Sequence, residues 1–201
     1  MKLFYSPASP FVRKVMIVAL EHNVADSIEK LACAAGPIKR DMSIVAQNPL
    51  GQVPTAISDD GVALYDSRVI CEYIDAAHGG SLFGSGAARW RNLVDQSVGD
   101  GILDAALLIR YENLARPAEL KCVDWEIGQY GKINSALDLL EGRAAALADR
   151  MDIGTITIGS ALGYLDFRFA EFDWRTAHPA LAAWFAGFAS HPSMVATFPV
   201  V

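Results

Sequence analysis

The first 80 residues alternate short apolar runs with polar turns that contain glycine or proline, a pattern that predicts alternating strands and helices. Residues 2–5 and 27–33 predict two strands, and between them the apolar positions of residues 11–20 recur at helical spacing. Such a strand–helix–strand unit is nearly always right-handed, with its two strands parallel. Residues 36–47 predict a short, irregular helix that leads away from this unit.

A hairpin and another helix complete this half of the chain. Residues 55–58 and 62–65 flank an Asp-Asp-Gly turn, and Asp-Gly between apolar runs is a strong hairpin signal. Asp66-Ser67 then opens an amphipathic helix that is expected to end at Ala77. The predicted order is therefore strand, helix, strand, connecting helix, strand, strand and helix.

The second half predicts helices only. Residues 79–86 hold four glycines in eight positions, so we place a linker there, between domains at residues 1–79 and 87–201. Helical patterns cover residues 87–116, 118–150, 157–171 and 179–190, and Gly99 and Gly101 are expected to bend the first of these helices. The fold class is thus an α/β domain followed by an all-α bundle.

Composition narrows the possible functions. The 201 residues are 52% hydrophobic and 20% charged, which is typical of a globular protein, and the net charge of -6 argues against a general nucleic-acid-binding or anionic-membrane-binding surface. No apolar run reaches the roughly 18 residues of a membrane span. The three cysteines lie far apart and the four histidines lack paired metal-ligand spacing, so we predict neither a disulfide framework nor a metal site. A reducing, cytoplasmic location and a chain without a signal peptide are the expectations.

Ser9 is the first candidate for chemistry. Ser9-Pro10 places a capping residue and then proline at the start of a predicted helix that follows a strand. Free amides and the positive end of the helix dipole stabilise an anion at such a place, and a thiolate is an anion. The alternative is that Ser9 only caps the helix.

Two further stretches suit a peptide ligand. Val53-Pro54 joins a loop to a strand, where an X-Pro bond can be cis and the backbone of Val53 can pair with an extended peptide; a plain loop proline is the alternative. Asp66-Ser67 puts a carboxylate and a hydroxyl at a helix start, which suits an amino-acid zwitterion; capping alone is again the alternative.

Taken together, these stretches resemble the cytosolic glutathione S-transferase family, in its bacterial, serine-type form. The matching segments are residues 6–15 (SPASPFVRKV), 48–54 (NPLGQVP), 65–74 (YDSRVICEYI), 178–184 (HPALAAW) and 191–193 (HPS). The resemblance spans essentially the whole chain. It implies a thioredoxin-like glutathione-binding domain, an α-helical domain, glutathione as co-substrate and a homodimer.

The resemblance also implies roles for individual residues. Ser9 looks like the serine that contacts the glutathione sulfur. Val53 with a cis Pro54 resembles the clamp on the cysteinyl backbone, Asp66 and Ser67 resemble the γ-glutamyl site, and Gln52 is placed to reach the glycyl end or the peptide backbone. Lys39 and Arg40 are candidates for attracting the anionic peptide, although a solvated pair explains them too.

Three features bear on the reaction type. Ser9-Pro10-Phe11-Val12 overlays the Cys-Pro-Tyr-Cys of glutaredoxins without either cysteine, which disfavours exchange through an enzyme thiolate. Tyr5 is the alternative of a tyrosine-type enzyme, but its place in the strand and its distance from Pro10 favour Ser9. Ser160 stands where the family has the aspartate of a capping box that starts at Thr157, so a less stable helix start is expected there.

The resulting expectation is a detoxifying glutathione transferase that conjugates the glutathione thiolate to small apolar electrophiles. Phe11, Leu107, Tyr111 and Tyr164 are position-based candidates for the electrophile pocket. A glutathione-dependent disulfide reductase or peroxidase, and a non-catalytic glutathione-binding regulatory protein, are the alternatives, because a fold does not fix a function.

Overall fold

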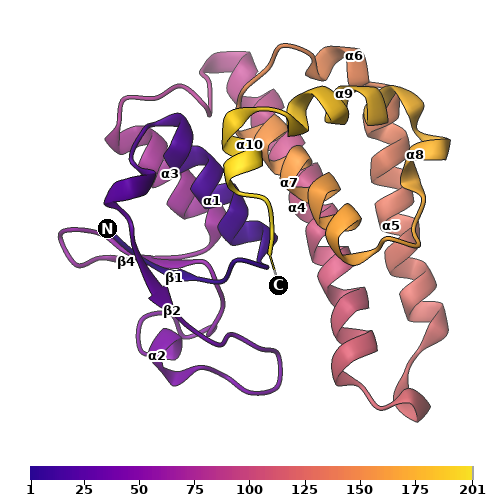
Figure 1. Ribbon diagram of the computed structural model, residues 1–201, viewed down its shortest axis with the longest axis horizontal. Helices are drawn as coiled ribbons and strands as arrows, with labels where there is room; N and C mark the ends of the chain where they lie inside the picture. Colours follow the sequence, from indigo (N-terminus) through magenta and orange to yellow (C-terminus); the bar gives the residue numbers. More distant parts are fainter. Residues whose placement is uncertain (201) are drawn as a thin grey trace.

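A four-stranded sheet forms the first half of the chain in the computed structural model, which describes residues 1–200 (Figure 1). Its strands are β1 (Lys2–Tyr5), β2 (Glu29–Ala32), β3 (Thr55–Ile57) and β4 (Ala63–Leu64), in the order β2-β1-β3-β4. β1 runs parallel to β2, with Lys2 opposite Glu29, whereas β3 is antiparallel to both β1 and β4. The predicted parallel pair and the predicted hairpin are both confirmed.

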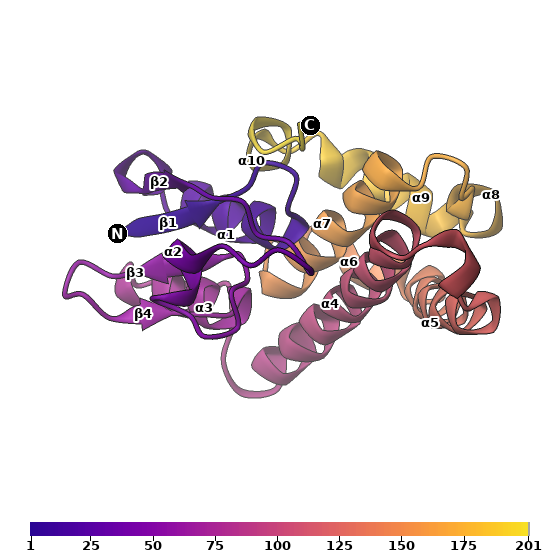
Figure 2. The same cartoon turned by 90° about the horizontal axis from the view of Figure 1, so that it is seen from below.

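Helices cover both faces of this sheet. α1 (Pro10–Glu21) and α3 (Ser67–Ala77) lie on one face, and the short α2 (Met42–Val45) lies on the other (Figures 1 and 2). A 3-10 turn, Ala25–Ser27, leads from α1 into β2. The helices α1 and α3 begin where the sequence predicts, because Ser9 and Asp66 each cap the first turn with a side-chain oxygen.

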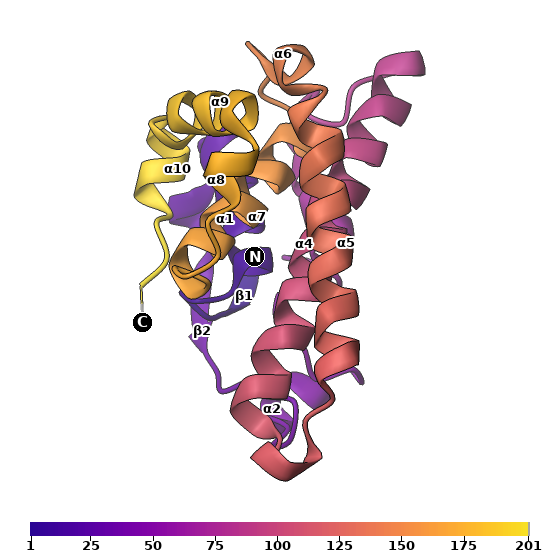
Figure 3. The same ribbon diagram turned by 90° about the vertical axis from the view of Figure 1, so that its right-hand side faces the viewer.

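The remainder of the chain is helical. Its elements are α4 (Gly86–Ala115), a 3-10 turn (Ala118–Leu120), α5 (Val123–Glu141), α6 (Ala144–Leu147), α7 (Ile153–Arg168), α8 (Trp174–Ala177), α9 (Pro179–Ala189) and α10 (Pro192–Ala196). The long helices α4 and α5 run side by side, with α7 packed against α4 (Figures 1 and 3). Among residues 1–200, no helix combines the length and the apolar character needed to cross a membrane.

Two predicted helices have different limits in the structure. The pattern over residues 118–150 is divided into α5 and α6, because the chain turns at Gly142, a residue with low helix propensity. The helix predicted from Thr157 begins four residues earlier, at Ile153.

A capping box explains the early start of α7. Asp152 Oδ1 accepts the N–H of Thr155 at 3.0 Å, and Thr155 Oγ1 accepts the N–H of Asp152 at 3.0 Å. Ser160 lies inside the helix, where its hydroxyl donates to the carbonyl of Ile156 at 2.8 Å. Ser160 therefore takes no part in the start of α7, contrary to the position expected from the sequence.

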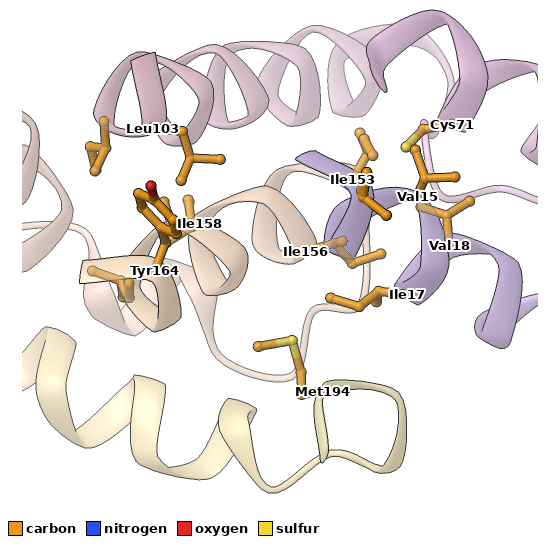
Figure 4. Packing of buried hydrophobic residues seen from close by; sticks show 14 of the residues in the cluster. Val15, Ile17, Val18, Cys71, Leu103, Ile153, Ile156, Ile158, Tyr164 and Met194 are labelled. Carbon is orange, nitrogen blue, oxygen red and sulfur yellow. The ribbon is translucent and has the colours of Figure 1, made fainter. Parts of the chain in front are cut away.

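The core is centred on α7, whose residues 153–162 are all buried. Side chains from α1, α4 and α10 meet it, and Figure 4 shows Ile156 of α7 beside Ile17 of α1. α4 runs without interruption through Gly99 and Gly101. A Cβ atom at Gly99 would lie 2.8 Å from the carbonyl carbon of Thr157, so this glycine permits the close approach of α4 and α7.

Charged side chains also join the two halves. Lys14 Nζ of α1 lies 2.6 Å from Asp100 Oδ1 of α4, and both side chains are almost fully buried. Arg68 Nε of α3 lies 3.0 Å from the other oxygen of Asp100. Arg13 of α1 donates to the carbonyl of Met194 in α10 at 3.0 Å. These contacts fix α1, and hence its N-terminus, against the helical half.

Candidate functional site

A cavity of about 880 Å³ lies between the sheet-containing half and the helical half. Its walls come from the loop before α1, the loop before β3, the start of α3, and the facing sides of α4 and α7. All ten site residues predicted from the sequence border it: Ser9, Phe11, Gln52, Val53, Pro54, Asp66, Ser67, Leu107, Tyr111 and Tyr164. Residues that are distant in sequence thus share one cavity.

Ser9 lies at the N-terminus of α1, half-buried at the wall of this cavity. Its Oγ accepts the N–H of Val12 at 3.3 Å. Because this contact uses a lone pair, the hydroxyl proton is left to donate to a ligand. Within residues 1–200, the N–H of Phe11 has no hydrogen-bond partner, so the helix start offers a second donor. This end of the cavity therefore suits an anion.

The loop before β3 presents a free backbone edge at Val53. The Val53-Pro54 bond is cis, as the sequence suggested. Buried Asn48 donates to Thr55 Oγ1 at 2.9 Å, and Thr55 Oγ1 donates to the carbonyl of Gln52 at 2.7 Å, which fixes the loop. In the part of the chain that the structure describes, neither the N–H nor the C=O of Val53 has a hydrogen-bond partner. This edge can pair with an extended peptide.

The start of α3 forms the third wall. Asp66 Oδ1 accepts the N–H of Arg68 at 2.9 Å, and the Ser67 side chain is buried. The capping role that the sequence left open for Asp66 is thus present. Asp104 faces this wall from α4, and burial, aided by the negative charge of Asp100, raises the pKa of its carboxyl group.

The opposite end of the cavity, which we call the α4–α7 end, is formed by Phe11 together with side chains of α4 and α7. Leu107 and Tyr111 lie one turn apart on α4, and Tyr164 of α7 directs its ring toward α4 (Figure 4). Burial raises the pKa of the Tyr164 hydroxyl to about 12, so this phenol stays protonated at neutral pH. The α4–α7 end thus combines apolar side chains with a phenolic donor.

Sequence reasoning missed several residues that border the same cavity. Besides Asp104, they include Arg68, Leu108, Arg110, Leu114 and Arg168. Helical spacing offered a signal for two of them, because Arg110 follows Leu107 by three positions and Arg168 follows Tyr164 by four. Arg40, which the sequence analysis considered as an attractant, also lines the cavity, and Lys39 is not among the lining residues that the structure describes.

Tyr5 does not border the cavity formed by the described residues; Lys30 Nζ lies 4.7 Å from the centre of its ring instead. None of the three cysteines contributes to the cavity wall as described over residues 1–200, and all three are unpaired. Those residues also contain no group of three or more His, Cys, Asp or Glu side chains arranged to hold a metal ion. Of the two alternatives, Ser9 and Tyr5, it is Ser9 whose side chain lies at the cavity, at the start of α1.

Similarity to known proteins agrees with this architecture. Residues 3–82 match the family described as glutathione S-transferase, N-terminal domain, and residues 100–187 match glutathione S-transferase, C-terminal domain. The chain is 34% identical over 207 residues to the uncharacterized GST-like protein YibF of Escherichia coli (strain K12), covering 99% of this chain and 98% of YibF.

Solved structures extend the comparison. A glutathione transferase family member from Pseudomonas fluorescens Pf-5, crystallised with bound glutathione, is 44% identical and superposes with a TM-score of 0.97 over 100% of this chain and 99% of the other. A structure from the same organism with bound S-(propanoic acid)-glutathione is 43% identical, with a TM-score of 0.92 and full coverage of both chains. The fold is a thioredoxin-like domain followed by a helical domain, and the chain belongs to the glutathione S-transferase family.

Proposed function

We propose that this protein is a glutathione transferase that joins the glutathione sulfur to small electrophiles. The observation that carries the proposal is the shared cavity, in which a helix start with a free hydroxyl proton at Ser9, an unpaired backbone edge at Val53 and the start of α3 at Ser67 surround one space. The crystal structures of relatives with bound glutathione or a glutathione conjugate support it.

Glutathione would lie extended along the sheet-containing half. Its cysteinyl backbone pairs with Val53, and its γ-glutamyl carboxylate meets the start of α3 at Ser67, beside Asp66. Gln52 and Arg40 take the glycyl end, because both border the cavity where the loop before β3 begins. The thiol then reaches Ser9.

Ser9 acts as a hydrogen-bond donor to the sulfur and not as a nucleophile. The donated hydrogen bond and the dipole of α1 favour the thiolate over the thiol. The thiolate attacks an electrophilic carbon held among Phe11, Leu107 and Tyr111. With an aryl or benzylic halide, a carbon–sulfur bond forms, the carbon–halogen bond breaks and halide leaves.

The test compares reaction types in one preparation. Calorimetry measures the affinity for glutathione, and product analysis measures conjugation of a halide panel against reduction of disulfides and hydroperoxides. We expect glutathione binding and conjugation. Disulfide or hydroperoxide turnover without conjugation selects the reductase or peroxidase, and binding without turnover of any substrate selects a regulatory protein.

A homodimer is the second part of the proposal. Val69 and Tyr73 on α3 and Trp90 and Val94 on α4 are 47%, 39%, 68% and 56% exposed, an unusual density of large apolar side chains. The Arg89–Glu72 ion pair, at 2.6 Å, holds these two helix surfaces next to each other. We expect light scattering to give twice the chain mass, and the substitution Trp90→Glu to yield a folded monomer.

The last part of the proposal is that the protein is located in the cytoplasm and acts in detoxification. Three free cysteines, one of them exposed, suit a reducing compartment. Growth of a deletion strain in the presence of electrophiles tests the role, and fractionation tests the compartment.

A further inference from the structure

Two arginines meet at the α4–α7 end of the cavity. Arg110 of α4 and Arg168 of α7 both border the main cavity, and both also border an adjoining side cavity of about 400 Å³. They therefore lie where the two cavities adjoin. Aromatic rings line the side cavity around them, including Tyr130, Phe169 and Phe172.

The part of the chain that the structure describes provides neither arginine with a carboxylate partner. Among residues 1–200, no carboxylate oxygen lies within 4.0 Å of either guanidinium, whereas Arg143, Arg150 and Arg175 each hold an aspartate at 2.5–2.8 Å. The Nε of Arg168 is buried and has no hydrogen-bond partner within the same residues.

The local charges leave an excess of positive charge. Glu171 is the acidic residue that lines the side cavity, and its side chain is exposed. Burial, and then the nearby positive charge of Arg110, lower the pKa of Arg168, so the two guanidinium groups repel each other. An anion between them would relieve this repulsion and satisfy the buried Nε donor.

A cation–π contact orients the guanidinium group of Arg168. Its guanidinium carbon lies 3.9 Å from the ring centre of Phe167, which holds the planar group in place. A planar, preorganised guanidinium suits a carboxylate, which it can bind through two parallel hydrogen bonds. Tyr164, whose hydroxyl remains protonated, adds a neutral donor to the same end of the main cavity.

We propose that Arg110 and Arg168 bind a carboxylate or an equivalent anionic group of the second substrate. The electrophiles of this enzyme are then apolar molecules with an anionic end, oriented so that the reactive carbon faces Ser9 and the anion faces the arginines. This inference rests on the proposed transferase function and narrows its substrate class.

The test compares an anionic electrophile, 4-(chloromethyl)benzoate, with its neutral methyl ester. Each loses chloride as the glutathione sulfur bonds to the benzylic carbon. After division by the uncatalysed rate, we expect kcat/KM to favour the carboxylate by about tenfold or more, the effect of one charge-assisted hydrogen bond. Arg168→Gln and Arg110→Gln should each remove most of this preference.

Arg91→Gln is the matched control, because Arg91 is an exposed arginine of α4 outside both cavities as described. The preference should survive in that variant. An equal preference in wild type, Arg110→Gln and Arg168→Gln would overturn the proposal. The proposal would also be overturned if both variants bound glutathione more weakly but kept the preference for the carboxylate electrophile. The arginines would then bind the peptide.

A binding measurement separates this inference from the proposed function. Calorimetric titration with the unreactive pair 4-methylbenzoate and 4-methylbenzamide needs no turnover. We expect the carboxylate to bind about tenfold more tightly than the amide, and Arg168→Gln to abolish the difference. Anion preference without conjugation refutes the transferase and keeps the anion site; conjugation without anion preference does the reverse.

Discussion

Replacing Ser9 tests the chemistry of the site most directly. A hydrogen bond to a charged group contributes about 1.5–3 kcal/mol, and each pKa unit corresponds to about 1.4 kcal/mol. Loss of the Ser9 hydroxyl should therefore raise the thiol pKa of bound glutathione by about one to two units. The dipole of α1 remains in the variant, so the pKa should stay somewhat below that of free glutathione.

The choice of variant decides what is measured, because Ser9 also caps α1 through Val12. Ser9→Ala removes both the proposed sulfur contact and the cap, and loss of the cap costs about 1 kcal/mol in the free energy of unfolding. Ser9→Gly removes the hydroxyl but costs only a few tenths of a kcal/mol as a cap, so it isolates the effect on sulfur. Ser9→Thr keeps a hydroxyl and should keep the wild-type pKa.

Thiolate absorbance of the bound peptide, recorded against pH, gives the pKa in each variant. Ser6→Ala is the matched control, since Ser6 borders the same cavity but does not cap the helix. Below both midpoints the conjugation rate should fall about three- to tenfold in Ser9→Gly, less than the thiolate fraction, because a thiolate of higher pKa is the better nucleophile. The same midpoint in wild type and Ser9→Gly would refute the role of the Ser9 hydroxyl.

Three further predictions concern stability. Gly99→Ala should lower the free energy of unfolding in urea by about 1–3 kcal/mol, because its Cβ would lie 2.8 Å from the backbone of α7. Gly101→Ala is the control and should be neutral or stabilising, because its Cβ would meet no atom of the described residues within 4 Å. Equal effects of the two substitutions would contradict the close approach of α4 and α7. Lys14→Met should cost about 3–5 kcal/mol, since it leaves the buried carboxylate of Asp100 without its lysine, and a loss below 1 kcal/mol would show that this ion pair does not hold the halves together. Burial and the charge of Asp100 raise the pKa of Asp104 in the folded state, so the charged carboxylate disfavours folding above that pKa. Asp104→Asn should therefore stabilise the protein at pH 7 and have no effect near about pH 3. The opposite pH dependence would contradict the raised pKa.

Local signals in the sequence predicted the elements of the sheet-containing half that border the cavity. Asp66 and Ser67 mark the start of α3 because a side-chain oxygen in that position caps the first turn, which is a short-range interaction. The Asp-Gly turn of the β3–β4 hairpin is a local signal of the same kind. The parallel β1–β2 pair was predicted instead from the strand–helix–strand order. α7 starts four residues before the position that the family pattern at Thr157 predicts, because Asp152 and Thr155 form a local capping box there.

Contacts between distant segments were not predictable from these signals. Lys14 and Asp100 are 86 residues apart, and only the packing of α1 against the helical half brings them together. The pairing of Arg110 with Arg168 depends likewise on how closely α4 approaches α7. A single sequence shows which face of each helix is apolar, but it does not show which faces pack against each other.

The 30-residue helix α4 has a consequence for redesign. Asp104 borders the cavity beside the start of α3, whereas Leu114, almost three turns further on, borders both cavities. A mutant library confined to Leu107, Leu108 and Leu114 would alter the accommodation of new electrophiles while the loop at Val53 stays unchanged. Under the proposed function, selection on such a library would vary the molecule that is modified and leave the binding of the tripeptide unchanged.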